Sequence, residues 1–311
     1  MRSSVTHDPT GKSKHTHPPE GAPIPSGLVN HLHRGRIETV LEQLPESSID
    51  CIFADPDYNI GVNYEGKSYK IQDKDYLGWC VAWAKECETV LKPDGNLFII
   101  NYPRNNALLW AECLDYLFAR VNEYVWVYRS NLGVGKRQFT TAHRSILHCT
   151  KSRKNRFYRD AVAEPYRNPT DRRVAQLIKD GSPGRMPYSW LTSGPPESIS
   201  TTAGLSWIRG IELEKNVNRS KSFHSCQIPE RLSKLLFRAT TKPGDTALVL
   251  FGGAGSELVV CEQLKLNWIS AELVSAYCDL IEARLKNGGA VPKQFRRTIP
   301  HRNVKPVEAY R

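Results

Sequence analysis

A glycine-rich turn between a strand and a helix constrains the fold of this chain more than any other feature. The apolar run TALVLF (246–251) leads into GGAGS, the helical pattern ELVVCEQLKL follows, and the next strand, WISAE, ends at Glu272. In open parallel sheets such a turn lies at the carboxyl ends of the strands, where nucleotide-containing cofactors bind. Glycines let the backbone approach a ligand, and the helix that begins near Ser256 offers free N–H groups. An acid about 20 residues after the turn can accept hydrogen bonds from a ribose diol.

The turn lacks the spacing of a triphosphate-binding loop and the third glycine of the dinucleotide fingerprint. A small adenosine-containing cofactor without a pyrophosphate therefore fits better. A strand followed by Gly-x-Gly also occurs where a tight turn only serves packing, so the turn by itself leaves both interpretations open.

The same alternation of strands and helices continues through most of the chain. Strands are expected at 49–54, 96–101, 124–129, 145–150 and on both sides of the turn, and helices at 36–44, 74–91, 104–119, 229–240, 257–266 and 274–286. Strand–helix–strand repetition at this spacing predicts an α/β fold, a sheet with helices on its faces.

A second motif, ADPDYNIG (54–61), directly follows the strand expected at 49–54. Proline cannot donate to a strand ladder and restricts the residue before it, so the strand ends here. The motif thus sets a carboxylate, a rigid kink and an aromatic ring at the end of a strand. A bare Asp-Pro-x-Tyr is more often a plain turn than a functional site, so its meaning depends on the rest of the sequence.

Asp-Pro-x-Tyr after one strand and Phe-x-Gly-x-Gly after another, with a basic region between them, resemble the paired motifs of the β-class amino-group DNA methyltransferases. The segments YLGWCVAWAKECETVLKPDGNLFII and FHSCQIPERLSKLLFRATTKPGDTALVLF extend the resemblance, which covers about 29–150 and 222–286, roughly four-fifths of the chain. It implies a Rossmann-like methyltransferase fold with a mostly parallel twisted sheet. It also implies S-adenosyl-L-methionine as cofactor, S-adenosyl-L-homocysteine as product and double-stranded DNA as partner.

The resemblance assigns the catalytic roles to Asp55, Pro56 and Tyr58. An exocyclic amine is a poor nucleophile because its lone pair is delocalised into the ring. Acceptors at Asp55 and the Pro56 carbonyl would draw its nitrogen towards a tetrahedral form, and Tyr58 offers a face on which a flipped base can stack. The residues expected to bind the cofactor are Asp55, His224, Cys226, Gln227, Phe251, Gly252, Gly253, Gly255, Ser256 and Glu272.

Four positions depart from the family pattern, namely Arg36, Asp57, Ile228 and Val249. Asp57 stands where a second proline is usual, which loosens the kink and adds a charge close to the chemistry. Val249 stands where the family often has an acid, which removes an expected partner for the methionine ammonium group. Because both motifs keep their other residues, an active but divergent enzyme is favoured over an inactive relative.

The net charge of +11 and the pI near 9.3 favour a polyanionic partner, nucleic acid before an anionic membrane. Residues 151–222 contain 14 Lys and Arg against 7 Asp and Glu, hence +7 of that charge, and their apolar periodicity fades. Basic and aromatic residues interleaved in this way suit phosphate contact and base stacking, which predicts an irregular target-recognition region. A basic surface insertion without a ligand is the alternative. The residues expected to contact DNA are Lys136, Arg137, Arg144, Arg172, Arg173 and Arg185.

Five segments are expected: a flexible tail at 1–27, a catalytic half at 28–150, the recognition region at 151–222, a cofactor-binding half at 223–287 and a basic tail at 288–311. The eight cysteines lack the spacing of a zinc site, so no metal is expected and the thiols should be reduced and buried. No apolar run is long enough to span a bilayer, and the N-terminus lacks a signal-peptide core. We therefore expect a cytoplasmic protein without a membrane partner, associated with the nucleoid through DNA.

The target base is less strongly indicated than the reaction. The family resemblance associates an initial Asp more with N6 of adenine, so adenine is favoured and N4 of cytosine is the alternative. A catalytically inactive DNA-binding partner with the same fold is an alternative of another class. Asp55 and the order of the motifs disfavour a protein-glutamine methyltransferase. A restriction–modification role and a homodimer rest on family habit alone.

Overall fold

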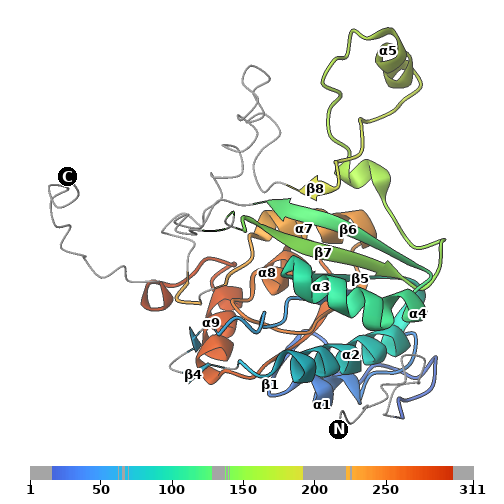
Figure 1. Ribbon diagram of the computed structural model, residues 1–311. Helices are drawn as coiled ribbons and strands as arrows, with labels where there is room; N and C mark the ends of the chain where they lie inside the picture. The colour runs from blue at the N-terminus through green and yellow to red at the C-terminus, as the bar shows by residue number, and fades with distance from the viewer. Residues whose placement is uncertain are drawn as a thin grey trace, which may run out of the picture.

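An eight-stranded sheet forms the centre of the molecule, and helices cover both of its faces (Figure 1). The computed structural model describes residues 16–61, 63–64, 67–68, 70–127, 137, 139, 141–191, 222–224 and 226–296. The strand order is β1-β10-β9-β2-β5-β7-β6-β8. These strands are β1 (His31–Arg34), β2 (Ile49–Ala54), β5 (Leu91–Asn101), β6 (Arg120–Val127), β7 (His143–Thr150), β8 (Trp190–Leu191), β9 (Thr246–Val249) and β10 (Asn267–Glu272). A separate pair consists of β3 (Asn63–Tyr64) and β4 (Lys67–Ser68).

Helices cover the sheet in one layer on each face, and one further helix lies away from it. They are α1 (Ile37–Leu41), α2 (Asp73–Val90), α3 (Pro103–Leu109), α4 (Asp115–Leu117), α5 (Arg172–Lys179), α7 (Glu230–Thr240), α8 (Ser256–Gln263) and α9 (Ser275–Lys286). A π-helical turn, η1 (Trp110–Leu114), joins α3 to α4, and two short 3₁₀ helices are η2 (Arg159–Val162) and η4 (Lys293–Phe295). One core lies between the sheet and α1–α4, the other between the sheet and α7–α9. Within the described residues, no helix has the length and apolar character needed to cross a membrane.

Residues on β5 show why the sheet is buried on both sides. Leu97 and Ile99 belong to the core under α2, whereas Phe98 and Ile100 belong to the core under α7. Successive side chains of a strand point to opposite faces, so a continuous apolar run fits a sheet covered on both. The strands β1, β10, β9, β2 and β5 are parallel, and β7 is antiparallel to both β5 and β6. The predicted α/β fold with a mostly parallel sheet is confirmed.

Several elements differ from the prediction. Strand β6 begins at Arg120 rather than at residue 124, α1 is shorter than 36–44, and β1 was not expected. β5 begins at Leu91, directly after α2, rather than at Asn96, and its pairing with β2 shifts register between Ile49 and Cys51. Gly95 permits this approach, because a Cβ there would lie 3.0 Å from the Asp50 carbonyl oxygen. The helix expected at 104–119 is interrupted by η1.

Both terminal segments are partly packed against the body, which corrects the expectation of a flexible tail for residues 16–27. The His17 side chain is 1% exposed, with Nε2 2.6 Å from Glu86 Oε2 and Nδ1 3.0 Å from the Leu44 carbonyl oxygen. At the other end, Val291 is buried in a small cluster against which Phe223 and Phe295 pack. Residues 1–15 and 297–311 lie outside the described residues.

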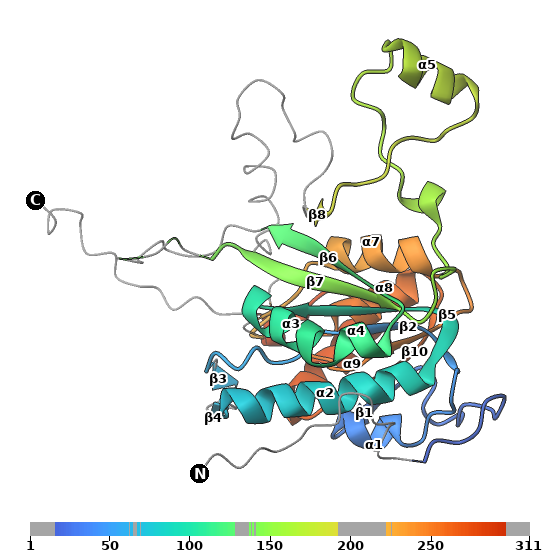
Figure 2. The ribbon, with the colours of Figure 1, turned by 45° about the vertical axis from the view of Figure 1, so that its right-hand side comes forward.

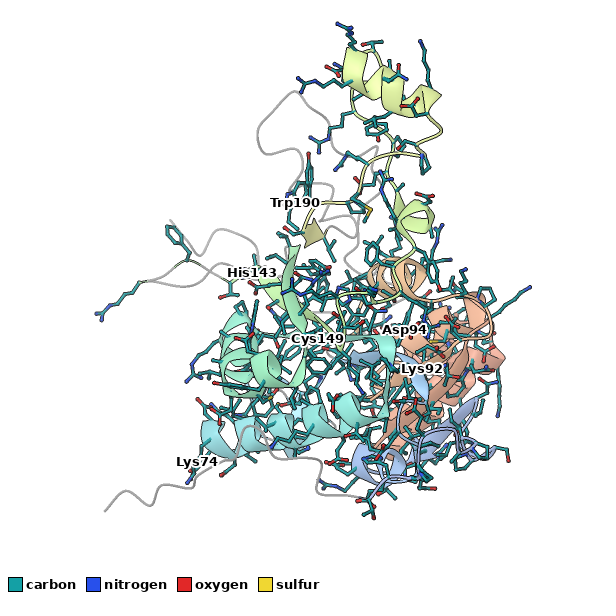
Figure 3. The ribbon with its side chains drawn as sticks, turned by 90° about the vertical axis from the view of Figure 1, so that its right-hand side faces the viewer. Lys74, Lys92, Asp94, His143, Cys149 and Trp190 are labelled. Carbon is teal, nitrogen blue, oxygen red and sulfur yellow. The ribbon has the colours of Figure 1, made fainter. Side chains whose placement is uncertain are left out.

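An arm, residues 157–189, projects from the sheet and carries α5 at its far end (Figures 1 and 2). The outgoing and returning segments of the arm are joined at Glu164 and Arg185. These two residues form paired backbone hydrogen bonds, both 2.8 Å, and a side-chain ion pair. The arm returns to the sheet at β8, which pairs in parallel with β6, and Figure 3 shows Trp190 at this junction. The rest of the predicted recognition region, 192–221, lies outside the described residues.

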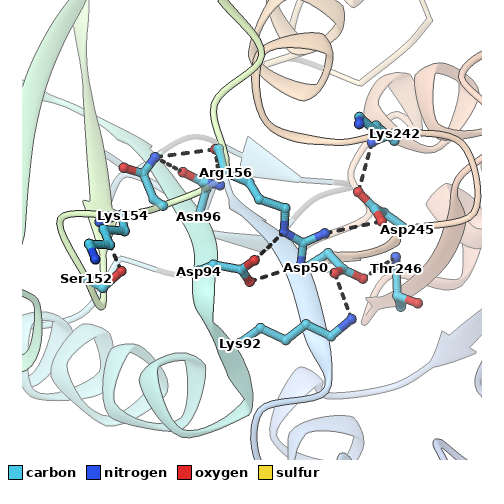
Figure 4. A network of polar contacts seen from close by, with 11 residues as sticks. Asp50, Lys92, Asp94, Asn96, Ser152, Lys154, Arg156, Lys242, Asp245 and Thr246 are labelled. Carbon is cyan, nitrogen blue, oxygen red and sulfur yellow. Dashed lines mark hydrogen bonds and ion pairs between the residues drawn. The ribbon is translucent and has the colours of Figure 1, made fainter.

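Arg156 ties the base of the arm to the sheet (Figure 4). Its guanidinium forms ion pairs with Asp50 on β2, with Asp94 on β5 at 2.9 Å and with Asp245 before β9 at 3.3 Å. Asp50 also accepts from Lys92 Nζ at 2.7 Å and from the Thr246 N–H at 2.8 Å. Burial alone would raise the pKa of Asp50, but these hydrogen bonds outweigh it and the pKa is lowered. The network thus holds three strands and the arm together.

We expect Arg156→Ala to destabilise the fold at pH 7 by about 1.5–3 kcal/mol, the range for a lost hydrogen bond to a charged group. Because the pKa of Asp50 is lowered by folding, its stabilising contribution is present at neutral pH and lost as the pH falls through the folded-state pKa. The difference from the wild type should therefore narrow towards about pH 3. Urea unfolding at pH 7 and at about pH 3 measures the difference in the free energy of unfolding. The control is Arg153→Ala, at an exposed position of the same segment. An equal loss at both pH values would contradict the role given to Asp50.

Candidate active site

Two loops meet at the carboxyl edge of the sheet. β2 and β9 are parallel neighbours, with Phe53 opposite Val249, so the loops that follow them begin side by side. The Leu250 N–H donates to the Phe53 carbonyl at 3.0 Å, which joins the strands up to this edge. Between the loops lies a cavity of about 370 Å³. The predicted residues that line it are Asp55, Pro56, Tyr58, His224, Cys226, Gln227, Phe251, Gly252, Gly253, Ser256 and Glu272.

Asp55 and Tyr58 of the first loop are directly bonded. The Tyr58 hydroxyl donates to Asp55 Oδ1 at 2.6 Å. Burial raises the pKa of Asp55 well above that of an exposed carboxyl; the Tyr58 hydrogen bond opposes this rise, and the charge of Glu257 adds to it. A carboxylate with a raised pKa binds a proton more readily, which suits a general base near neutral pH.

Asn59 fixes the shape of this loop. It has a φ of +57°, a left-handed conformation that asparagine tolerates better than most residues. Its side chain donates to the Ile71 carbonyl at 3.0 Å and accepts from the Ile71 N–H at 2.8 Å. The loop is therefore held in place from outside the motif.

Asp57 presents a second carboxylate to the cavity where the family usually has proline. Its Oδ1 accepts from the Asn59 N–H at 2.8 Å, and its carbonyl accepts from the Tyr76 hydroxyl at 2.6 Å. Oδ2 is buried and has no hydrogen-bond partner among the described residues. A buried acceptor of this kind is costly unless a ligand or water satisfies it.

The ring of Tyr58 packs beside a second tyrosine and a cation. Tyr102, which follows β5, meets it edge to face with 5.4 Å between ring centres. The Arg144 guanidinium lies 3.7 Å from the ring centre of Tyr102 and 5.0 Å from that of Tyr58. Sequence patterns pointed to Arg144 only as a DNA contact, whereas the structure brings it to the catalytic motif.

The glycine turn holds the acid that ends β10. The Gly253 and Val274 N–H groups donate to the two oxygens of Glu272, each at 2.8 Å. Gly253 has a φ of +52°, and a Cβ on Gly252 would lie 2.8 Å from Ile281 Cδ1. Gly255, with a φ of +74°, is the N-cap of α8 and does not contribute to the cavity lining. The Glu272 carboxylate is thus fixed while keeping lone pairs for a ligand.

The cavity is also lined by a segment that lies between the two loops in the sequence. Its lining residues are His224, Cys226 and Gln227. His224 accepts from the Cys226 N–H through Nδ1 at 3.3 Å, and burial lowers the pKa of this histidine to about 4, so it is neutral at pH 7. Gln227 Oε1 accepts from the Ser222 N–H at 3.1 Å and from its hydroxyl at 3.0 Å. Gln227 therefore orders the segment that leads into α7.

An aromatic wall of the cavity was missed by sequence reasoning. Trp79 on α2 packs against Phe251 with 5.5 Å between ring centres and donates to Glu38 Oε1 at 2.9 Å. Burial would raise the pKa of Glu38, but the hydrogen bond from Trp79 helps to lower it. Arg36, noted only as a departure from the family, lines the cavity and pairs with Glu38 at 3.4 Å. The sequence signal for Trp79 was the apolar face of α2. The same pattern is expected for a helix that packs only on a core and for one that lines a binding site.

The other departures lie in different places. Ile228 is buried and contributes to the cavity lining. Val249 is 1% exposed and belongs to the core under α7–α9, below the edge where the cavity lies. Glu257, which sequence reasoning did not single out, is buried and also contributes to the lining.

The predicted DNA contacts are distributed over the molecule. Arg172 and Arg173 are exposed on α5 at the end of the arm, and Arg137 is exposed. Arg185 pairs with Glu164, and its guanidinium lies 4.3 Å from the ring centre of Tyr188. Lys136 lies outside the described residues.

The cavity suits an adenosine-containing ligand. It combines an aromatic wall for a base, a fixed carboxylate for a ribose and a glycine turn that allows close approach, and apolar walls with a few polar groups are typical of cofactor sites. Seven of the eight thiols are buried, and Cys226 is partly exposed. In the part of the chain that the structure describes, no group of three or more His, Cys, Asp or Glu residues could hold a metal ion.

Residues 49–283 match the N6/N4 DNA methylase family model. The chain is 30% identical over 262 residues to the Type II methyltransferase M.BamHI of Bacillus amyloliquefaciens, which covers 82% of this chain and 57% of that protein. It is 26% identical over 246 residues to the DNA adenine methyltransferase YhdJ of Escherichia coli K12, which covers 79% of each. The chain thus spans little more than half the length of M.BamHI.

Solved structures share the fold. The cytosine-N4-specific PvuII DNA methyltransferase superposes with a TM-score of 0.55 at 19% identity, covering 83% of this chain and 92% of that one. M1.HpyAVI, solved with S-adenosyl-L-methionine, superposes with a TM-score of 0.50 at 15% identity, covering 82% and 98%. The predicted Rossmann-like methyltransferase fold is confirmed. With its family model matched over most of its length, this chain belongs to the N6/N4 DNA methylases, the amino-group DNA methyltransferases that use S-adenosyl-L-methionine.

Proposed function

We propose that this chain transfers a methyl group from S-adenosyl-L-methionine to the exocyclic amine of a base in double-stranded DNA, with N6 of adenine as the favoured target. The observation that carries the proposal is the meeting of the Asp55-Pro56 loop and the glycine turn in one cavity. Adjacent parallel strands supply both loops, so the acceptor for the amine and the cofactor-binding groups share one space of ligand size.

The cofactor would be held mainly by the second loop and its neighbours. Glu272 accepts from the ribose hydroxyls, Phe251 and Trp79 provide an apolar surface for adenine, and Gly253 allows close approach of the backbone. When bound, S-adenosyl-L-methionine supplies an electrophilic methyl group. The buried, neutral His224 helps to exclude water from the same wall.

Asp55 activates the target amine. Its carboxylate and the Pro56 carbonyl accept the two N–H bonds of the amine, which draws the nitrogen lone pair out of conjugation with the ring. As the nitrogen gains its bond to carbon it must lose one proton, and the raised pKa of Asp55 suits this carboxylate to take it.

The target base must leave the duplex to reach Asp55, because enzymes that modify the amino groups of bases act on flipped nucleotides. The ring of Tyr58 is the proposed stacking face. Arg144 supplies a positive charge beside it, which can contact a phosphate of the flipped nucleotide.

Recognition of the target sequence is assigned to the basic region 151–222. The support is the projecting arm with Arg172 and Arg173 exposed at its end, together with the +7 charge of the region. Arg137, Arg185 and Lys136 are proposed as further DNA contacts. A homodimer and association with the nucleoid are part of the same proposal and derive from the family resemblance.

The central test is methyl transfer from labelled S-adenosyl-L-methionine to unmethylated DNA, with the methylated nucleoside identified by mass spectrometry. We expect N6-methyladenine. Asp55→Ala and Asp55→Asn should each slow transfer by about two to three decades, or 3–4 kcal/mol, the scale for removing one preorganised group. Asp115→Asn is the control, because Asp115 is an exposed carboxylate on α4 that accepts from Trp110 outside the cavity.

The outcomes separate the alternatives. If the product is N4-methylcytosine, the target base is cytosine and not adenine. Absence of transfer by a wild-type protein that binds both DNA and cofactor would identify an inactive DNA-binding partner. Full activity of Asp55→Asn would remove Asp55 from the mechanism.

Glu272→Ala should weaken binding of S-adenosyl-L-methionine by about 1.5–3 kcal/mol, the usual range for losing a charged acceptor. The two backbone N–H groups that Glu272 accepts from would also lose their partner. Isothermal titration calorimetry measures the change, and Glu282→Ala on the exposed face of α9 is the control. Equal affinity of Glu272→Ala and the wild type would refute the ribose placement.

Neutralising Arg172 and Arg173 with glutamine should flatten the salt dependence of DNA binding. Each lost phosphate contact should reduce the log–log slope by about 0.9, while cofactor affinity stays the same. Lys74→Gln, at an exposed position on α2 far from the arm (Figure 3), is the control. An unaltered slope would place the DNA footprint elsewhere.

A further inference from the structure

We infer that Glu257 binds the ammonium group of the methionine portion of the cofactor. It would take the role of the acid that the family often has at the position of Val249. The inference rests on the proposed function and adds to it the residue that recognises the amino-acid end of the ligand.

Glu257 lies where such a contact is needed. It is the second residue of α8, directly after the glycine turn, and its side chain contributes to the cavity lining although the residue is only 5% exposed. One oxygen accepts from the Ser233 hydroxyl at 3.2 Å. Its charge acts on Asp55 across the cavity, where it helps to raise the pKa of that carboxyl. Glu257 is thus both enclosed and electrostatically coupled to the catalytic loop.

Its position on the helix determines which ligand charge is favoured. The free N–H groups at a helix N-terminus attract anions such as phosphate. A carboxylate in the first turn satisfies that preference from within the protein. A ligand phosphate would then meet a buried negative charge, whereas a ligand cation would be stabilised. This matches a cofactor that carries an ammonium group and no phosphate.

Among the residues that the structure describes, the cation that acts on Glu257 is Arg284, which forms its ion pair with Glu230. Arg284 on α9 directs its donors to Glu230 Oε1 at 2.7 Å, to the Gly289 carbonyl at 3.1 Å and to the Ala254 carbonyl, and its charge reaches Glu257 only as a weaker attraction. Glu230 on α7 and Asp55 after β2 are both acids, and the Cys261 thiol on α8 is buried.

Burial raises the pKa of Glu257 to about 7, against the opposing hydrogen bonds from its own backbone N–H and from Ser233 and against the charge of Arg284. A bound cation favours the ionised carboxylate, so binding near neutral pH should release a proton from the protonated fraction. Affinity for a ligand with an ammonium group should therefore fall as the pH drops below about 7.

Val249 cannot supply the same contact. It is 1% exposed within the core under α7–α9 and does not line the cavity. Within the described lining, the acids are Glu38, Asp55, Asp57, Glu257 and Glu272. Glu38 accepts from Trp79 and pairs with Arg36, and the remaining lone pairs of Glu272 are assigned to the ribose. Asp55 is assigned to the amine of the base, which leaves Glu257 and Asp57. Glu257 is preferred because it adjoins the glycine turn.

The test compares three ligands with three proteins by calorimetry at pH 8. S-adenosyl-L-methionine carries an ammonium, a carboxylate and a sulfonium group, S-adenosyl-L-homocysteine lacks the sulfonium, and 5′-methylthioadenosine lacks all three charges. Loss of the Glu257 charge can weaken the first two ligands through their ammonium group but not through their carboxylate, which that charge repels. Glu257→Gln keeps the shape and can still accept from Ser233. We expect it to weaken the first two ligands by about tenfold to a hundredfold and to leave the third unchanged. Glu262→Gln, at an exposed position of the same helix outside the cavity lining, should leave all three within about twofold.

Repeating the wild-type titration in buffers of different ionisation enthalpy at pH 7 should show proton release that Glu257→Gln abolishes. Unchanged affinities in Glu257→Gln, or weakening of S-adenosyl-L-methionine alone, would overturn the ammonium assignment. Equal weakening of all three ligands would also overturn it, since this would indicate a distorted cavity. A wild-type protein that binds none of the three ligands would overturn the proposed function itself, and thermal unfolding of each variant verifies that it is folded.

Discussion

The parallel pairing of β2 with β9 is the constraint on which the rest of the site depends. Asp50 on β2 and Thr246 on β9 are 196 residues apart in the sequence, yet the Thr246 N–H donates to the Asp50 carboxylate and the strands stay in register up to Phe53 and Val249. The two loops that carry the chemistry therefore emerge from one edge, although the cofactor loop comes last in the chain. Folding of the sheet and assembly of the site are the same event.

The molecule separates its charges by depth. The chain has a net charge of +11 and exposes basic residues such as Arg172 and Arg173 on the arm, while the cavity collects Asp55, Asp57 and Glu257. Enclosure of these carboxyls raises the pKa of Asp55 and of Glu257. A polyanion is thus attracted to the outside, and a small cation with an apolar base is favoured inside, so the two proposed substrates have distinct destinations.

Sequence patterns predicted the sheet, the two loops and eleven of the residues that line the cavity, because apolar periodicity and glycine turns are local signals. They could not predict Trp79 or Tyr102, whose roles arise from how α2 and the end of β5 pack on the motif. Composition also misjudged residues 16–27, since a segment poor in apolar residues can be held by one buried contact such as that of His17 with Glu86. The predicted lengths of elements were wrong where pairing with another strand extended them, as at the start of β5.

The arm is fixed to the body at its two ends, away from its tip. Arg156 secures its entry to three strands, and its return is secured by β8, which pairs with β6 at the edge of the sheet. Between these anchors, the exposed chain can change length and composition without moving the edge that bears Asp55, since surface insertions perturb a rigid scaffold little. With the recognition role proposed for the arm, its tip can therefore be exchanged during evolution as a module, so that one body acquires new recognition sequences while its cavity stays unchanged.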